Sequence, residues 1–479
     1  MSVFNWIIVG LNIPLSLLSA AHALFFKRTP QSALVWVAVC LTFPFVGPVV
    51  YFVFGINRVR NRARRLEIKR PPHRVEPGGG DSLETAKHPP ADLEVSRAVS
   101  DIARISDNVA RAPLVGGNRI DLLHNGEAAY PAMIQAMENA EHRIFLCTYI
   151  FDTDSAGRQI IGALTAAAAR GVEVRVIVDG FGELYSRPRA SVLLEKAGIA
   201  CTRFLPPRLL PLPMLHINLS THKKTLVVDG DVGFTGGMNI GDRHLAEVED
   251  NSKRVVDTHF RLTGPVVRQL EQSFIEDWSF CTGQPLEPIA TPTVSRGKAV
   301  CRAISDGPSE PVDKLSTILV GAVATARKHV MIMTPYFLPS VEMISAIQTT
   351  VLRGTRVDIV LPSVNNLPFI QWATNNMLYE LLFWGANIYF QPPPFVHSKL
   401  FVADGQYAQI GSANMDPRSL KLNFELNVEI FDANVVEDIT GYVAEKIERS
   451  RQIYLADINN RSFPAKTRDA LMWLFSPYL

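Results

Sequence analysis

Cysteine is scarce in this sequence, with five residues among 479, and the five are scattered along the chain. No two of them have the spacing of a metal site, and an odd number does not suit a disulfide framework. Cys40 and Cys147 lie inside apolar runs, which predicts small buried side chains. We therefore expect no disulfide-bonded fold and no metal site made of cysteine, as is usual in a reducing compartment.

An excess of charge of one sign is also missing. The chain carries 48 basic and 46 acidic residues, a formal net charge of +2 at pH 7. A protein held mainly by nucleic acid usually has a strongly basic domain, so no nucleic-acid partner is expected. Apolar residues, by contrast, make up 47% of the chain, and 479 residues are enough for two or three domains.

Two long apolar stretches open the sequence. Residues 3–26 are nearly uncharged, residues 33–55 carry no charge, and six residues separate them. Each stretch exceeds the about 20 apolar residues that a membrane-spanning helix needs, so we predict a transmembrane helical hairpin over residues 1–57. A cleaved signal peptide is the alternative for the first stretch, because Ala21 to Ala23 offers a small-x-small cleavage pattern. Against this alternative, no basic residue precedes the apolar run.

A basic cluster follows the second stretch and predicts the orientation of the hairpin. It consists of Arg58, Arg60, Arg62, Arg64, Arg65, Lys69, Arg70 and Arg74. The positive-inside rule places this cluster, and everything after it, in the cytoplasm. The cluster can also bind anionic lipid or be no more than the flank of a membrane segment, and both interpretations stay open. We predict a basic cytoplasmic linker over residues 58–112, with a flexible part at Pro71 to Asp81.

One ten-residue pattern occurs twice in the rest of the chain. "THKKTLVVDG" covers Thr221 to Gly230, and "VHSKLFVADG" covers Val396 to Gly405. A histidine, a lysine and an aspartate match between the copies at one constant offset: His222, Lys224 and Asp229 in the first, His397, Lys399 and Asp404 in the second. One copy would be a weak signal, but two complete copies make these six residues the catalytic candidates. Each aspartate precedes a glycine after a strand, which favours a turn-fixing role over a catalytic one.

The match extends to both sides of this pattern. Downstream, "TGGMN" and "IGSAN" place Asn239 and Asn414 at the same offset. Upstream, "ALTAAAARGVEVRVIVDG" (163–180) and "AIQTTVLRGTRVDIVLPS" (346–363) each predict a helix, a turn and a buried strand. Strands that alternate with helices indicate an α/β fold, and we expect mainly parallel strands.

The repeat divides the chain after the linker into two similar α/β domains, residues 113–290 and 291–456, followed by a C-terminal segment, residues 457–479. Because each copy supplies only one histidine, the domains should face each other across a pseudo-two-fold axis with one active site between them. Three apolar segments are candidates for contact with a membrane surface, although core packing explains them equally well: Pro206 to Leu215, Asn365 to Trp384, and Ala470 to Leu479.

These motifs resemble those of the phospholipase D superfamily, which is named for its His-Lys-Asp motif. Within it, the chain is similar over almost its whole length to the membrane-anchored cardiolipin synthases of bacteria. Besides the repeated pattern, the similarity lies in residues 29–55 and in "FTGGMNI", "HFRLTGPVV" and "GSANMDPRSLKLNFE". The resemblance implies two phospholipase D-like α/β domains in a multi-pass protein of the bacterial inner membrane. Two positions depart from the family pattern and leave the lipid preference open: Val255-Val256, where Trp-Arg is expected, and Ser220, where a basic residue is common.

Two histidines suit a two-step attack on a phosphodiester. A neutral imidazole can attack phosphorus and form a covalent intermediate, and the opposite imidazolium can protonate the leaving oxygen, since the histidine pKa lies near working pH. Two lysines and two amides of the motifs can hold the negative charge that develops at phosphorus: Lys224, Lys399, Asn239 and Asn414. The cationic lysine side chains can do the electrostatic work of a metal, so we expect neither a metal nor a cofactor.

The resemblance also implies individual roles. By analogy with the family, His222 is the nucleophile and His397 the acid/base, although the symmetry of the repeat leaves the reverse assignment open. The acidic residues downstream, Asp257 and Glu425, are expected to hold the histidine rings.

The resemblance implies phosphatidylglycerol as both donor and acceptor, with cardiolipin and glycerol as products. With water as the acceptor, the same site would make a phospholipase D, and the motifs do not separate these outcomes. A nuclease or phosphodiesterase of the same superfamily is a further alternative, against which the near-neutral charge argues. An inactive membrane scaffold is another, against which the two complete motifs argue. No prediction of oligomeric state follows from the sequence.

Overall fold

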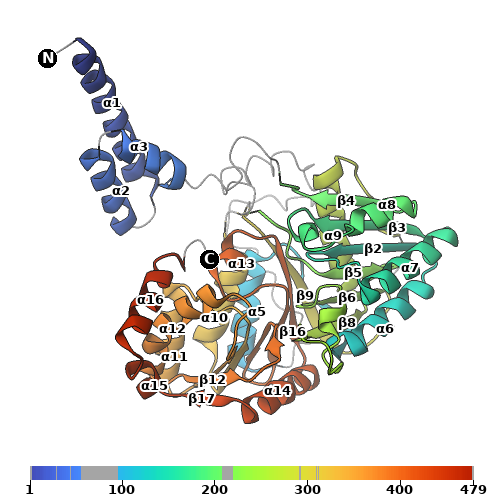
Figure 1. Cartoon of the computed structure of the whole chain (residues 1–479). Coiled ribbons are helices and arrows are strands. Elements are labelled where there is room, and N and C mark those ends of the chain that lie inside the picture. The colour runs from blue at the N-terminus through green and yellow to red at the C-terminus, as the bar shows by residue number, and fades with distance from the viewer. Residues whose placement is uncertain are drawn as a thin grey trace. The chain divides into compact units, whose positions relative to one another are not determined.

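The computed structural model describes residues 3–27, 30–43, 45–55, 95–207, 219–290, 293–308, 310 and 312–476. Two compact units make up the chain (Figure 1): the N-terminal unit, Met1–Arg65, and the large unit, Leu66–Leu479. Three features predicted above lie outside the described residues: the basic cluster from Arg58 to Arg74, the Pro71 to Asp81 stretch, and residues 208–215 of the first apolar segment.

The described residues of the N-terminal unit form three helical pieces. α1 (Val3–Phe26) covers the first apolar stretch in one run of 24 residues, as predicted. The second stretch is divided, because α2 (Pro30–Thr42) ends early and α3 (Val46–Val50) continues into the π-turn η1 (Tyr51–Gly55). The sequence has Pro44 at this break, and proline lacks a backbone N–H and disfavours helical backbone at the preceding residue. The prediction of one helix for the second stretch is therefore wrong.

The last piece of this unit folds back onto the first two. The ring centroid of Tyr51 lies 5.3 Å from that of Trp36, and the Tyr51 hydroxyl lies 2.7 Å from Nδ1 of His22. Lys27 donates a hydrogen bond to the carbonyl oxygen of Gly55. The end of η1 thus lies beside the α1–α2 connection, whereas two helices crossing side by side would put these points at opposite ends. Within the described residues, no helix combines the length and the hydropathy of a membrane span.

Within its described residues, the large unit is built on one sheet of 15 strands. Its first half contributes β1 (Val115–His124), β2 (Arg143–Thr148), β3 (Glu173–Asp179), β4 (Ala200–Phe204), β5 (Thr225–Val228), β6 (Val232–Gly236) and β8 (Thr258–Thr263). Its second half contributes β9 (Ala299–Asp306), β10 (His329–Met333), β11 (Arg356–Pro362), β12 (Asn387–Gln391), β14 (Leu400–Ala403), β15 (Tyr407–Gly411), β16 (Glu425–Phe431) and β17 (Arg451–Ile453). A separate pair joins β7 (Val255–Val256) of the first half to β13 (Phe395–Val396) of the second.

The order of the strands repeats from the centre of the sheet outward. The first half runs β1-β8-β6-β5-β2-β3-β4, and the second runs β9-β16-β15-β14-β10-β11-β12-β17. β1 and β9 pair at the centre in antiparallel orientation. The prediction of two similar α/β halves is confirmed, and they share one sheet and one compact unit.

Most strand pairs of this sheet are antiparallel, so the prediction of a mainly parallel sheet is wrong. Only β2–β3, β3–β4, β10–β11 and β11–β12 are parallel among the described strands of the sheet. These pairs follow the helical crossovers that the sequence predicted. By contrast, β5 and β14, which lie between the lysine and the aspartate of each motif, return through tight turns into β6 and β15.

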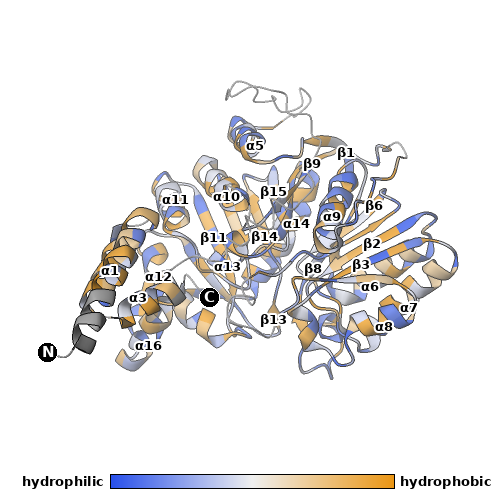
Figure 2. Cartoon of the chain, turned by 90° about the horizontal axis from the view of Figure 1, so that it is seen from above, coloured by the Kyte–Doolittle hydropathy of each residue, from blue (hydrophilic) through white to orange (hydrophobic). Residues whose placement is uncertain are grey.

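Helices cover both faces of the sheet, with the apolar strands between them (Figure 2). In the first half, α6 (Asn125–Glu138), α7 (Ser155–Ala169) and α8 (Ala190–Lys196) bury one face, and α9 (Val267–Thr282) lies on the other. In the second half, α10 (Lys314–Thr325), α11 (Val341–Leu352) and α12 (Pro368–Leu382) belong to one core cluster. The remaining helices are α5 (Arg97–Val109), α13 (Pro417–Lys421), α14 (Ala433–Glu448), α15 (Leu455–Asn459) and α16 (Phe463–Trp473).

Two segments predicted to lie outside the domains pack against the large unit. α5 buries Val99 and Ile102 in the core of the second half, so the predicted linker over residues 58–112 ends in a packed helix. α16 packs along α12, and its Met472 contacts the cluster that contains Ile370.

Candidate active site

The two His-Lys segments lie just before β5 and β14, and each pairs with the opposite half of the molecule. The backbone N–H of His222 donates to the carbonyl of Phe424, and that of His397 donates to the carbonyl of Val256, both at 2.8 Å. These contacts bring together two histidines that lie far apart in the sequence, one in each half.

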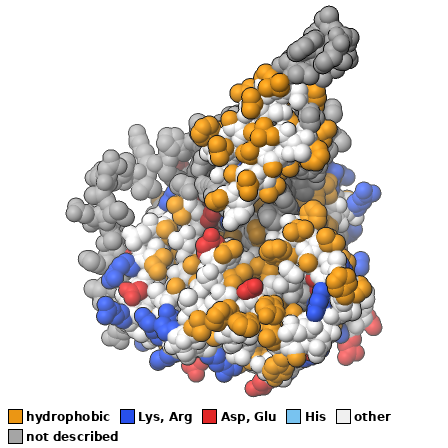
Figure 3. Space-filling view, turned by 90° about the vertical axis from the view of Figure 1, so that its left-hand side faces the viewer, with side chains coloured by type: hydrophobic (Ala, Val, Ile, Leu, Met, Phe, Trp, Pro, Cys, Tyr) orange, Lys and Arg blue, Asp and Glu red, His pale blue; other side chains and the backbone are white. Residues whose placement is uncertain are grey.

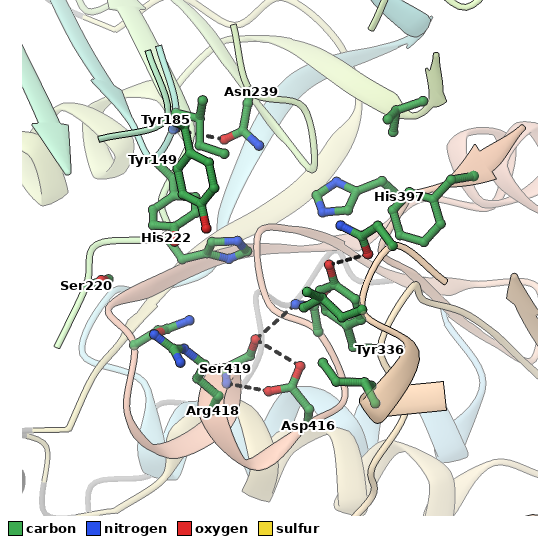
Figure 4. A pocket seen from close by; sticks show the side chains of 18 of the residues that line it. Tyr149, Tyr185, Ser220, His222, Asn239, Tyr336, His397, Asp416, Arg418 and Ser419 are labelled. Atoms are coloured by element: carbon green, nitrogen blue, oxygen red, sulfur yellow. Dashed lines mark hydrogen bonds between the residues drawn. The ribbon is translucent and has the colours of Figure 1, made fainter. Parts of the chain in front are cut away.

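Both histidines face one cavity of about 430 Å³ between the halves (Figure 4). The two motif asparagines, Asn239 and Asn414, also line it, and so do two arginines, Arg243 and Arg418. Aromatic side chains form much of the remaining wall: Tyr149, Phe181, Tyr185, Tyr336, Phe369 and Phe395. The geometry therefore offers one shared site, as the repeat predicted.

Each histidine ring is held by a buried carboxylate from the other half. Nδ1 of His222 lies 3.0 Å from a Glu425 carboxylate oxygen and 3.0 Å from the carbonyl oxygen of Ser412. Nδ1 of His397 lies 2.9 Å from Oδ2 of Asp257. Sequence reasoning selected both acids but associated each with the motif of its own half. Each acid reaches the histidine of the other half because of the pairing described above. Glu425 comes directly after Phe424, and Asp257 directly after Val256, the residues whose carbonyls pair with His222 and His397.

The two carboxylates differ in their affinity for a proton. Burial alone would raise the pKa of Asp257, but the hydrogen bond and charge of His397, with the charge of Lys399, hold it well below its usual range. Burial raises the pKa of Glu425 to about 7, against the opposing effects of Lys224 and of the hydrogen bonds it accepts. Asp257 is therefore ionised at neutral pH, whereas Glu425 binds a proton much more readily.

Burial also lowers the pKa values of the two motif histidines and the two motif lysines. It lowers the pKa of His222 well below the usual value, with help from the charges of Lys224 and Lys399. Burial and Lys399 lower the pKa of His397 to about 4, although Asp257 opposes this. Burial lowers the pKa of Lys224 to about 7 and that of Lys399 to about 8. Each ammonium donates to the carbonyl of its motif histidine, at 2.6 Å and 2.5 Å, so the two buried lysines lie directly beside the histidines.

The two asparagines differ in how they are held. Oδ1 of Asn239 accepts from the backbone N–H of Ile150 at 3.2 Å, which leaves its amide N–H groups for the cavity. Nδ2 of Asn414 donates to Oγ of Ser419 at 3.2 Å, and its Oδ1 has no hydrogen-bond partner among the described residues.

The motif aspartates are absent from the cavity lining in the described structure. Asp229 and Asp404 have positive φ angles of 50° and 54° at the β5–β6 and β14–β15 turns. The Asp229 carboxylate accepts from the backbone N–H groups of residues 141–143, and the Asp404 carboxylate from those of residues 327–329. They tie each turn to the start of the neighbouring strand, as a turn-fixing role requires.

Sequence reasoning missed several residues of the cavity wall. Arg243 and Arg418 follow the motif asparagines at one spacing and at the offset that relates the two motifs, a signal that could have found them. The ring of Tyr149 lies 5.1 Å from that of His222, and the Lys224 ammonium lies 5.4 Å from the Tyr149 ring. No sequence signal marked Tyr149, because its counterpart in the aligned strand is Pro335. Among the described residues, no group of three or more metal-ligating side chains is arranged to hold an ion.

A family model described as "Cardiolipin synthase, PLD-like domain" matches residues 133–278 and 319–447. The chain belongs to this family. A second model, for the N-terminal region of phospholipase D and nuclease proteins, matches residues 15–55.

Similar proteins in this family match the chain along nearly its whole length. The chain is 30% identical to cardiolipin synthase A of Pseudomonas putida, over 98% of this chain and 97% of that one. It is 30% identical to the cardiolipin synthase of Alkalihalophilus pseudofirmus, over 99% of this chain and 95% of that one. The crystal structure of phosphatidylserine synthase from Haemophilus influenzae superposes with a TM-score of 0.62 at 15% identity, over 79% of this chain and 100% of that one. This last similarity establishes the fold alone.

Proposed function

We propose that this chain is a cardiolipin synthase, which transfers a phosphatidyl group from one phosphatidylglycerol to a second and releases glycerol. The observation that carries the proposal is the pair of histidines facing one cavity, each held by a buried carboxylate and flanked by a buried lysine. Relatives named cardiolipin synthase match over the full chain, which supports this lipid as the substrate.

The reaction takes two steps at one phosphorus. Nε2 of His222 attacks the donor phosphate, the bond to the glycerol oxygen breaks, and His397 gives that oxygen a proton. The terminal hydroxyl of the second lipid then gives its proton to His397 and attacks phosphorus, which breaks the phosphorus–nitrogen bond and restores neutral His222. The buried lysines and the amides of the motif asparagines hold the charge that develops on the phosphate oxygens.

The carboxylates support this division of roles. A nucleophile must be neutral, and His222 has the more strongly lowered pKa of the pair. An acid must exist as imidazolium. Burial and Lys399 oppose that form by lowering the pKa of His397 to about 4, and the ionised Asp257 beside it is the group that stabilises the imidazolium. Glu425 beside His222 has a raised pKa, binds a proton more readily than Asp257, and so stabilises an imidazolium less.

The N-terminal unit serves as the membrane anchor in this proposal. With 24 residues, α1 is about 36 Å long, more than the hydrocarbon thickness of about 30 Å, whereas the 13 residues of α2 reach about 20 Å. Because Lys27 contacts Gly55, the residue that ends α1 and the residue from which the chain runs on toward the basic cluster lie at the same end of the unit. The positive-inside rule puts that end in the cytoplasm of a bacterial inner membrane, with the large unit on the same side.

Cysteine labelling tests this anchor. Arg28→Cys and Asn57→Cys, each in a chain without its native cysteines, should react with a membrane-impermeant reagent from the same side of sealed vesicles. Labelling from opposite sides would contradict the fold-back and restore the simple hairpin.

The activity test uses purified full-length chain in detergent with phosphatidylglycerol as the only phospholipid. Cardiolipin and glycerol in equal amounts are expected, with an acid-quenched phosphohistidine peptide that contains His222. His222→Ala and His397→Ala should abolish turnover, whereas His142→Ala, an exposed control, should not. Phosphatidic acid in place of cardiolipin would make the enzyme a phospholipase D, and label on His397 alone would reverse the histidine roles.

A further inference from the structure

Arg243 lines the cavity and is held rigidly along one edge of its guanidinium group. Nε and Nη2 donate to Oδ2 of Asp152 at 3.1 and 2.6 Å, and Oδ1 of Asp152 accepts from Oγ of Ser186 at 2.6 Å. Nη1 has no hydrogen-bond partner among the described residues, and 34% of the Arg243 side chain is exposed. A guanidinium fixed on one side, with donors left on the other, is preorganised to bind an anion.

The position of Arg243 is on the His397 side of the cavity. The next residue, His244, has Nδ1 4.0 Å from Oδ2 of Asp257, the carboxylate that holds His397. The turn Asp242–His244 also contacts β7, which pairs with the strand that leads into His397. Arg418, its counterpart in the repeat, lies toward His222, since its charge contributes to the lowered pKa of that histidine.

In the proposed reaction, the His397 side of the cavity binds the leaving glycerol and then the incoming alcohol. In an in-line displacement, the leaving glycerol and the incoming alcohol both lie opposite the nucleophilic nitrogen of His222, next to the acid/base His397. When the alcohol is a second phosphatidylglycerol, its own phosphodiester lies only three carbons and one oxygen away from the attacking hydroxyl. That second negative charge must approach the reacting phosphate, whose charge the two buried lysines already engage.

We propose that Arg243 binds the phosphodiester of the acceptor lipid, and so selects a phosphate-bearing alcohol over water or a neutral alcohol. This proposal rests on the proposed function, because it concerns the second substrate of the same reaction. Asp152 is a positioning residue, which holds the guanidinium with its remaining edge toward the cavity. Glycerol, which has no phosphate, gains nothing from Arg243, and therefore provides an internal comparison.

The test compares three acceptors with phosphatidylglycerol as donor in detergent. The first is a second phosphatidylglycerol, followed as cardiolipin. The second is radiolabelled glycerol, which exchanges into phosphatidylglycerol through the same donor step. The third is glycerophosphoglycerol, the deacylated lipid, which has the diester but no acyl chains. Arg243→Gln should lower kcat/KM for both phosphodiester acceptors about 30-fold, the usual worth of a charge-assisted hydrogen bond pair, and change glycerol exchange less than about threefold.

Two further variants separate phosphate binding by Arg243 from the positioning of its guanidinium by Asp152. Arg243→Lys should recover part of the loss, and Asp152→Asn should give a smaller loss of the same kind. Arg449→Gln, at the exposed end of α14, should leave all three reactions unchanged. Parallel losses of exchange and synthesis in Arg243→Gln, or a lowered melting temperature that accounts for both, would overturn the proposal. A wild-type chain that exchanges glycerol but never makes cardiolipin would instead contradict the proposed function.

Discussion

The two motif histidines match in sequence but differ in what holds each ring. The ring of His397 faces the ionised Asp257, and that of His222 faces both Glu425 and the carbonyl of Ser412. An ionised acid stabilises the imidazolium form of the ring beside it more strongly than a carbonyl group, or an acid with a raised pKa, does. The chemical asymmetry of the pair is therefore set by the neighbours and not by the motif itself.

Replacing the two acids should have unequal effects. Asp257→Asn removes the anion that holds His397 in place, and loss of such an anion costs about 10³- to 10⁴-fold in kcat. Glu425→Gln should cost about tenfold, because Ser412 still accepts from Nδ1 of His222. Transfer rates in detergent, for variants with unchanged melting temperature, measure the difference. Losses of equal size, or in the reverse order, would contradict the assignment of His397 as the acid/base.

The dependence of kcat/KM on pH should show the loss of protons from the two buried lysines. Because burial lowers the pKa of Lys224 to about 7 and that of Lys399 to about 8, both lose their protons as pH rises, and with them the positive charge that the phosphate needs. We expect kcat/KM to fall between about pH 7 and 9, and kcat to fall less, since bound phosphate raises both pKa values again. Parallel profiles for the two constants would mean that the lysines do not lose protons in this range.

At the scale of elements, the motif turns hold the site in place without touching it. Asp404 accepts from three consecutive backbone N–H groups with a φ of 54°, a conformation that aspartate and asparagine tolerate better than other side chains. Asp404→Ala should lower the free energy of unfolding by about 2–4 kcal/mol through lost hydrogen bonds and added backbone strain. Asp404→Asn should cost less. Urea unfolding of the purified chain measures both.

A surface aspartate provides the matched control for this change. Asp438→Ala, on the exposed side of α14, should change the free energy of unfolding by less than about 0.5 kcal/mol. An Asp404→Ala chain that is as stable as wild type but inactive would contradict the structural role and make the aspartate catalytic.

The sequence predicted these elements better than it predicted their pairing. Periodicity located the helix and strand around Arg170 and Arg353, because local apolar patterns determine such units. It could not show that β5 pairs back onto β6, because that depends on a left-handed residue at position 229. The exchange of Asp257 and Glu425 between the halves was also hidden, since it arises from contacts between segments that are distant in the sequence. Arg243 and Arg418 were missed although they match at the offset of the repeat, because the sequence does not show that these two arginines line the cavity.

At the scale of the whole molecule, the cavity opens beside an apolar rim. Phe369, at the start of α12, lines the cavity and is 36% exposed. Met472 of α16 packs against the buried cluster that contains Ile370, the residue after Phe369. The next residues, Trp473, Leu474 and Phe475, are exposed, and apolar side chains gather on the face that carries α12 and α16 (Figure 3). Two of the three apolar segments singled out in the sequence thus meet near one opening.

This rim should bring the cavity to the lipid surface. The triple change Trp473→Ser, Leu474→Ser and Phe475→Ser should lower the rate on phosphatidylglycerol vesicles at least about tenfold, because interfacial binding grows with buried apolar area. The rate on a short-chain lipid dissolved below its micelle concentration should stay within about twofold, since the histidine site is untouched. As a control, Val192→Ser with Val294→Ser changes two exposed valines outside the rim and should alter neither rate. Equal losses on vesicles and on dissolved lipid would show that α16 stabilises the fold of the cavity wall and does not dock it to the membrane.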